Sequence, residues 1–498
     1  MGNTIQPQAR PVVSTPNPEP SAPRVAPAVP PASPQVARPR DVFVPDAQAT
    51  PARGAPNALA ATGGTQDSGA SAAGTPATLS AADEASANEA IGQAYDSRDA
   101  SAVADWLEAH PDPATQAAFM DLLFSRDELA GLILDDSQWL SAADQQRISG
   151  ALDRAYRSGA VTEQELSDAV GGVYAGALPG ESHEQLAGII AGTGNPELIA
   201  AYAKRELEHL RADDPQRASA IATALAGMPP EALQAFLRDN PEAVGDMLQN
   251  INAGMDSSYS PALGKLLDAA SQIQPPTAES LQLFTDSIDK LGENTSSREA
   301  AARFFMRHGD AVLGSLRDAS GSLGLDGQKK LSEFFTRTLF TEPEYEGQTA
   351  LREDVMRRLD SLQTALNQEA NASPPSSDAK RQARLMGSLV GALEGGFQVA
   401  VDELNQRNDA TEGMVKLLFS AKALLPNLPL PGAGLLKNLT IDAIQKWVTE
   451  SLKENAQSPA DAIPFHRAFG ELIANPDLRT DYDAARGDAF VNRQRGLS

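Results

Sequence analysis

The side chains best suited to catalysis or metal binding are scattered along this sequence in no recognised spacing. None of the five histidines lies in an H-E-x-x-H or H-x-H pattern, either of which would gather ligands on one element. They are His110, His183, His209, His308 and His466. No serine-nucleophile or phosphate-loop motif occurs, and the absence of cysteine excludes thiolate catalysis and disulfides. We therefore predict no catalytic residue, no metal and no cofactor.

Three short motifs containing acidic residues are weaker candidates. Asp135-Asp136 and Asp213-Asp214 lack the alternating ligands and central glycine of a calcium loop, so we interpret both pairs as solvated helix ends. Arg486-Gly487-Asp488 spells the integrin-binding tripeptide, which must be presented in an exposed, extended loop. Its flanking residues predict a helix instead, so we give the tripeptide no functional role.

A stripe of glycines near the C-terminus is the most specific pattern. Gly387, Gly391 and Gly395 recur every four residues, so they share one helix face and permit another helix to approach closely. They belong to an apolar arm, Leu385–Val401, and a second apolar arm follows at Leu417–Leu436. We expect the two arms to form a helical hairpin over residues 385–436. Glu394, Lys422 and three prolines interrupt the arms, which favours a buried hairpin over a membrane-inserting one.

The elements that position these residues are predicted to be helices. Apolar residues recur every three or four positions from Ser80 onward, and alternating strand patterns are nearly absent. Aromatic residues make up only 5% of the chain, which suits helix-on-helix packing through Leu, Ala, Ile, Val and Met. The clearest predicted helix starts are Ser80, Ser141, the capping box Thr162–Glu165, Asn195-Pro196, Pro229-Pro230 and Asn240-Pro241. The fold class is therefore all-α.

Composition divides the chain into four parts. Residues 1–79 are predicted to be a disordered arm, rich in proline and alanine and then in glycine and serine. Residues 80–370 form an acidic helical array, 371–377 a Pro/Ser linker, and 378–498 a C-terminal helical domain. Two Asn-Pro-Glu helix starts lie 45 residues apart, near the period of HEAT-like repeats, but their flanks do not align. We expect an irregular multi-helix array, with a solenoid as the alternative.

Charge is concentrated in the helical part of the chain. The whole chain carries −25, whereas residues 1–80 contain five arginines and four acidic residues, leaving about −26 for the rest. Such a surface repels phosphate backbones, so we predict no nucleic-acid partner.

In general organisation the chain resembles bacterial type III secretion substrates. The resemblance rests on the polar, unstructured stretch from Met1 to about Thr78, the lack of a cleaved signal and of cysteine, and the acidic, alanine-rich helical body. It implies an effector-like virulence protein, secreted without a cleaved signal peptide into a host cell or otherwise cytoplasmic. The partners it implies are a secretion chaperone and a host or bacterial target protein.

Three functions stay open from the sequence. The favoured one is an exported helical protein that acts by protein–protein interaction. The second is a membrane-active translocator or pore-forming component that uses hairpin 385–436. The third is an enzyme whose site is assembled from distant helices, which would leave no local motif.

Overall fold

The computed structural model describes residues 78–405 and 469–494, except for 127, 136–139, 177–183, 252–259, 293, 342–343 and 471. Within these residues every regular element is a helix, apart from one isolated bridge between Arg317 and Leu323. The described residues belong to one compact unit. The prediction of an all-α multi-helix array is therefore confirmed. Residues 1–77 of the predicted arm lie outside the described part.

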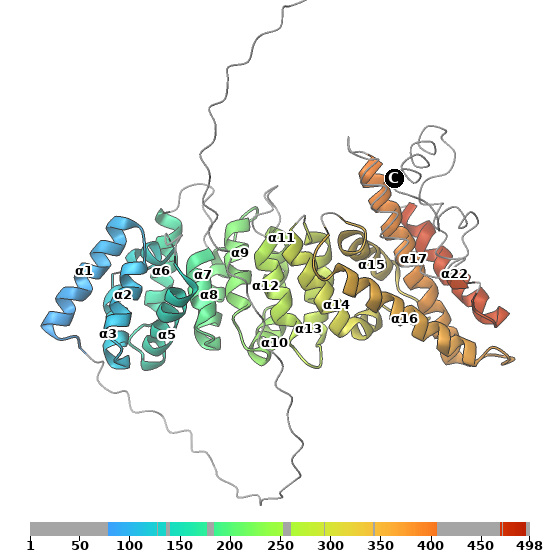
Figure 1. Cartoon of the computed structure of the whole chain (residues 1–498), viewed down its shortest axis with the longest axis horizontal. Coiled ribbons are helices and arrows are strands. Elements are labelled where there is room, and N and C mark those ends of the chain that lie inside the picture. The colour runs from blue at the N-terminus through green and yellow to red at the C-terminus, as the bar shows by residue number, and fades with distance from the viewer. Residues whose placement is uncertain are drawn as a thin grey trace, which may run out of the picture. The chain divides into compact units, whose positions relative to one another are not determined.

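The helices follow one another in chain order and alternate between two rows (Figure 1). In row A, each helix packs against the next member of the same row: α3 (Pro113–Phe124), α5 (Ala142–Ser158), α7 (Glu184–Gly192), α9 (Pro215–Leu225), α12 (Ser260–Ser271), α14 (Thr295–Ser315) and α16 (Gln348–Gln368). Row B contains α4 (Glu128–Asp135), α6 (Glu163–Gly176), α8 (Pro196–His209), α10 (Pro230–Asp239), α13 (Ala278–Ser287), α15 (Leu325–Thr338) and α17 (Ser377–Asn405). This alternation is the packing pattern of helical solenoids.

Four further elements complete the described part. Helices α1 (Ala81–Ser97) and α2 (Ser101–Ala109) precede the rows, and the short 3₁₀ helix η2 (Ile288–Lys290) connects α13 to α15. Helix α11 (Pro241–Asn250) packs on α9, α10 and α13, and α22 (Pro476–Gln494) packs along α17. The predicted linker 371–377 is the connection between α16 and α17, which contact each other. The predicted division into separate domains at this point stays a prediction.

Most predicted helix starts carry the caps that the sequence indicates. The amide of Asp144 donates to the Ser141 hydroxyl at 3.2 Å at the start of α5. The capping box of α6 is reciprocal, because Thr162 N donates to Glu165 Oε2 at 2.8 Å while Glu165 N donates to Thr162 Oγ1 at 3.3 Å. Each such cap satisfies amides that the helix itself leaves unpaired, which is worth about 1 kcal/mol.

The two Asn-Pro-Glu starts are not equivalent in the structure. Asn195 caps α8 by accepting from the amide of Glu197 at 3.1 Å. Asn240 instead turns back and donates to the carbonyl of Phe236 at 2.9 Å, closing α10 and leaving α11 without a side-chain cap. Helix α8 belongs to row B, whereas α11 packs outside the succession of both rows. The 45-residue spacing therefore does not mark a structural repeat.

Glycines allow backbones to meet where helices of one row pack together. A Cβ at Gly131 of α4 would overlap the carbonyl oxygen of Ala169 on α6, the next helix of row B. In row A, a Cβ at Gly227, just after α9, would overlap the backbone of Ala191 on α7. At such contacts the helices approach more closely than any side chain permits.

The densest aromatic packing lies between α13, α14 and α15. Phe284 stacks on Phe304 with ring centroids 4.7 Å apart, and Phe305 lies 5.0 Å from Phe334. All four side chains are buried. One part of the array therefore holds a cluster of stacked phenylalanines that overall composition does not reveal.

The glycine contacts predict a clear difference between two Gly→Ala substitutions. Gly131→Ala should destabilise the protein by about 1–3 kcal/mol, the usual result of overpacking, because the added methyl group meets backbone that cannot rotate away. Gly171→Ala, on an exposed position of α6 with no neighbour within 4 Å, should stabilise it by roughly 0.5–1 kcal/mol. Urea unfolding followed by circular dichroism measures both, and equal midpoints would contradict the proposed close contact.

Candidate protein-interaction groove

The described histidines have structural partners. His308 is buried, with Nε2 2.8 Å from the carbonyl oxygen of Ser271. His110 stacks on Trp106 at 3.9 Å between ring centroids, and Nδ1 of His209 lies 3.0 Å from the carbonyl oxygen of its own helix neighbour Arg205. His183 and His466 lie outside the described residues. In the part of the chain that the structure describes, no three His, Asp or Glu side chains gather as a metal site would require.

The acidic motifs are placed at helix ends or within a helix. Asp214 caps α9 by accepting from the amide of Arg217 at 3.1 Å, and Asp135 accepts from the amide of Leu186 at 3.2 Å. Asp136 lies outside the described residues. The tripeptide that begins at Arg486 lies within α22, where the Arg486 guanidinium pairs with Glu394 at 2.8 Å. It is therefore not presented in an extended loop.

All three glycines of the predicted stripe are buried on α17. A Cβ at Gly387 would overlap the carbonyl oxygen of Tyr482 on α22, and it would lie 3.2 Å from the amide nitrogen of Arg486. The helix that approaches this end of the stripe is thus α22. The second predicted arm, Leu417–Leu436, lies outside the described residues, so hairpin 385–436 stays a prediction. Among the described helices, none combines the length and the apolar character needed to cross a membrane.

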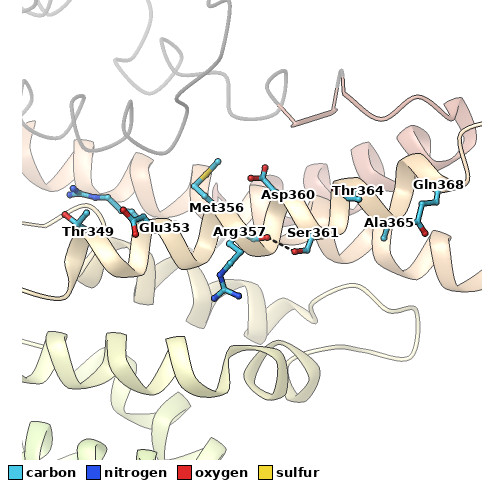
Figure 2. A pocket seen from close by; sticks show the side chains of 10 residues that line it. Thr349, Glu353, Met356, Arg357, Asp360, Ser361, Thr364, Ala365 and Gln368 are labelled. Atoms are coloured by element: carbon cyan, nitrogen blue, oxygen red, sulfur yellow. Dashed lines mark hydrogen bonds between the residues drawn. The ribbon is translucent and has the colours of Figure 1, made fainter. Parts of the chain in front are cut away.

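One described hollow lies along α16 and measures 850 Å³. Figure 2 shows its side chains following one helix from Thr349 to Gln368. Because all of its described lining residues come from α16, it brings together no groups from different elements. It is therefore a weaker candidate for a site than two smaller hollows on row A.

These two hollows adjoin, sharing Asp268 and Gln272, and together we call them the row-A groove. Their volumes are 580 and 570 Å³. The residues come from α5, α7, α9, α12 and α14 and from the turn after α9. The lining consists of Gln145, Gly188, Ala191, Gly192, Thr223, Ala226, Gly227, Lys265, Asp268, Ala269, Ser271, Gln272, Arg303, Met306 and Arg307.

Small residues line the part of the groove near α7 and α9 because helices approach one another there. A Cβ at Gly192 would lie 2.6 Å from the hydroxyl oxygen of Ser149 and 3.1 Å from its Cβ. Ser149 in turn donates to the carbonyl of Ile189 at 2.7 Å, which ties α5 to α7. The same contacts that join the helices therefore fill the space beside Gly192.

Thr223 is the most unusual polar residue of the groove. Its side chain is 3% exposed, and its buried hydroxyl has no hydrogen-bond partner in the structure. A buried hydroxyl left unpaired costs about 1–3 kcal/mol. The hydroxyl oxygen itself has almost no accessible surface, so this unpaired group destabilises the packing of α9 and is not a contact open to an occupant.

Cations predominate among the charged groups of the groove. Arg303 forms a two-pronged ion pair with Asp268, at 2.9 and 2.6 Å, and the hydrogen bond to that carboxylate raises the pKa of the guanidinium. Arg307 donates to the carbonyl of Ser271 at 3.0 Å. Among the described residues no carboxylate pairs with Arg307 or with the exposed Lys265. The groove therefore presents positive charge on an acidic protein.

Sequence reasoning did not find the groove, because its residues range from Gln145 to Arg307 and form no local motif. The one available signal was the small residues near helix ends. Gly192 is one of these residues, because it ends α7. Its contact with Ser149 on another helix depends on the tertiary arrangement.

No protein-family model and no curated protein sequence matches the chain. Among solved structures, the crystal structure of an engineered protein is similar at a TM-score of 0.38 and 15% sequence identity, over 84% of this chain and 96% of that chain. A similarity this low supports no argument about function.

The unpaired hydroxyl predicts opposite effects for two conservative substitutions. Thr223→Val removes a buried polar group that has no partner and keeps the side-chain shape, so stability should be unchanged or rise by up to about 1 kcal/mol. Ser149→Ala removes a buried hydrogen bond and leaves the Ile189 carbonyl short of a donor, so it should lower stability by about 1–3 kcal/mol. Urea unfolding of both variants tests this. A loss for Thr223→Val as large as that for Ser149→Ala would show that the hydroxyl is already satisfied.

Proposed function

We propose that this protein acts by binding partner proteins, with the row-A groove as its docking surface. The observation that carries the proposal is a groove across five helices of row A in which, among the described residues, Lys265 and Arg307 have no carboxylate partner. Stacked helical arrays commonly use such extended surfaces for binding.

The form of the groove favours a polypeptide over an enclosed small ligand. It crosses five helices, and it joins small residues at Gly188 and Ala226 to amide side chains at Gln145 and Gln272. An extended chain can lay its backbone against the small residues and pair its amides and carbonyls with the polar ones. Each hydrogen bond contributes only about 1 kcal/mol, so several along a groove are needed for useful affinity.

We also propose that the protein is exported and acts as an effector. The support is the composition of residues 1–80, which are rich in proline and small polar residues and nearly balanced in charge, ahead of a strongly acidic helical body. The proposal of export is independent of the groove, and the two can fail separately.

Export is tested by fusing residues 1–80 to a reporter in a bacterium with a type III secretion system. The fusion should reach the medium, and it should stay in the cells of a strain that lacks the secretion ATPase. A fusion of residues 81–160 to the same reporter is the matched control and should be retained. Retention of both fusions would contradict the proposal of export.

Docking is tested by placing a photo-crosslinking phenylalanine analogue at Gln272 in the groove or at the exposed Gln164 on row B. Irradiation in cells should give discrete protein adducts from position 272 that are absent from position 164. Ala226→Trp, which fills the groove, should abolish these adducts, whereas Ala82→Trp on the exposed side of α1 should not. Identical adducts from both positions, or adducts that survive Ala226→Trp, would contradict docking in the groove.

A further inference from the structure

We infer that the row-A groove selects an acidic, extended segment of a partner protein. This inference rests on the proposed docking function and specifies the chemistry of the partner. Two features carry it: cations that have no carboxylate partner among the described residues, and small residues beside them.

The net charge of the groove is positive, whereas that of the whole protein is negative. The chain has a net charge of −25, yet the charged residues of the groove are three cations and one carboxylate. Asp268 is engaged by Arg303 through two hydrogen bonds, which leaves Lys265 and Arg307 to face an occupant. Lys265 precedes Asp268 by one helix turn on α12, so one face of that helix carries both charges. An acidic side chain near Lys265 and Arg307 would complete the charge pairing.

Steering by charge makes these cations important despite their small number. The acidic remainder of the protein repels acidic chains, so a local positive surface determines where such a chain can bind. A basic segment would be attracted to the body in general and repelled only at the groove. Selection of an acidic segment by this groove is therefore a specific prediction.

Small side chains add a steric requirement. Ala191, Ala226 and Ala269 line the groove on the same side as Lys265. The occupant should therefore carry a small residue beside these alanines and an acidic residue toward Lys265.

The number of helices crossed indicates the length of the segment. Neighbouring packed helices lie about 8–10 Å apart, so five helices span roughly 36 Å. An extended chain covers about 3.3 Å per residue, which corresponds to about eleven residues. The chain's own residues 1–80 do not fit, because their five arginines outnumber their four acidic residues.

The test is selection from a random eleven-residue peptide library on the full-length protein, followed by fluorescence anisotropy with an enriched peptide. Acidic peptides should be enriched, and replacing their Asp and Glu by Asn and Gln should weaken binding about tenfold or more. The double variant Lys265→Glu, Arg307→Glu should weaken binding of the acidic peptide by about tenfold or more as well. It should also shift the selection toward basic peptides.

Lys204→Glu is the matched control, because Lys204 is an exposed lysine on row B for which the structure records no ion pair. It makes the same charge change outside the groove and should leave binding unaltered. Circular dichroism and urea unfolding of each variant separate a loss of binding from a loss of folding.

The outcomes distinguish the inference from the function on which it rests. Enrichment of neutral or basic peptides that Ala226→Trp blocks would overturn the acidic preference and keep the docking groove. Acidic binding that survives the double charge reversal would also overturn the inference. Binding of a single-stranded oligonucleotide to the groove as tightly as the acidic peptide would likewise overturn the inference, because the groove would then not select a polypeptide. Failure to enrich any peptide, together with no groove-specific adducts in cells, would overturn the docking function itself.

Discussion

Close approach of neighbouring backbones is the constraint on which the rest of this structure depends. Each row is held together where a residue without a side chain meets the backbone of the next helix, as at Gly131 against Ala169 and Gly227 against Ala191. Gly387 plays the same part between α17 and α22. Apolar burial supplies most of the driving force for folding, but it is not directional. The glycines decide how near the helices come and therefore which side chains can meet across them.

The groove follows from the same geometry. Where α5, α7 and α9 approach one another, the surface between them is lined by Gly188, Ala191 and Gly192, and a polar residue such as Thr223 can be buried without a partner. The Phe284–Phe304 region beside it is filled by stacked rings instead. The region around α13, α14 and α15 is thus tightly packed by aromatic rings, whereas the neighbouring segment of row A presents small residues and positive charge. This contrast makes row A the part of the molecule best suited to hold another chain.

Local signals predicted much of the fold and none of the groove. Caps such as Ser141 and Thr162 bond to amides three residues away, so the helix starts could be found from the sequence. The start of α11 at Pro241 was predicted correctly, but the hydrogen bond of the Asn240 side chain was not. That side chain had two local choices, the amides ahead and the Phe236 carbonyl behind, and only packing decides between them. The alternation of two rows, the partner of Gly387 and the exposure of Lys265 depend on contacts between distant helices. Residue spacing along the chain does not determine them.

The contact between α5 and α7 can be tested directly, because the chain contains no cysteine and an introduced pair has no competitor. In the variant Ser149→Cys, Gly192→Cys, the Cβ atoms would start 3.1 Å apart, just short of the disulfide range of about 3.5–4.5 Å. Mild oxidation of the folded protein should therefore link the two residues with retention of helical circular dichroism. The pair Ser149→Cys, Gly171→Cys, whose second position faces open space, should stay reduced. Two freely reactive thiols in the folded Ser149→Cys, Gly192→Cys variant would contradict the close packing from which the rows and the groove are built.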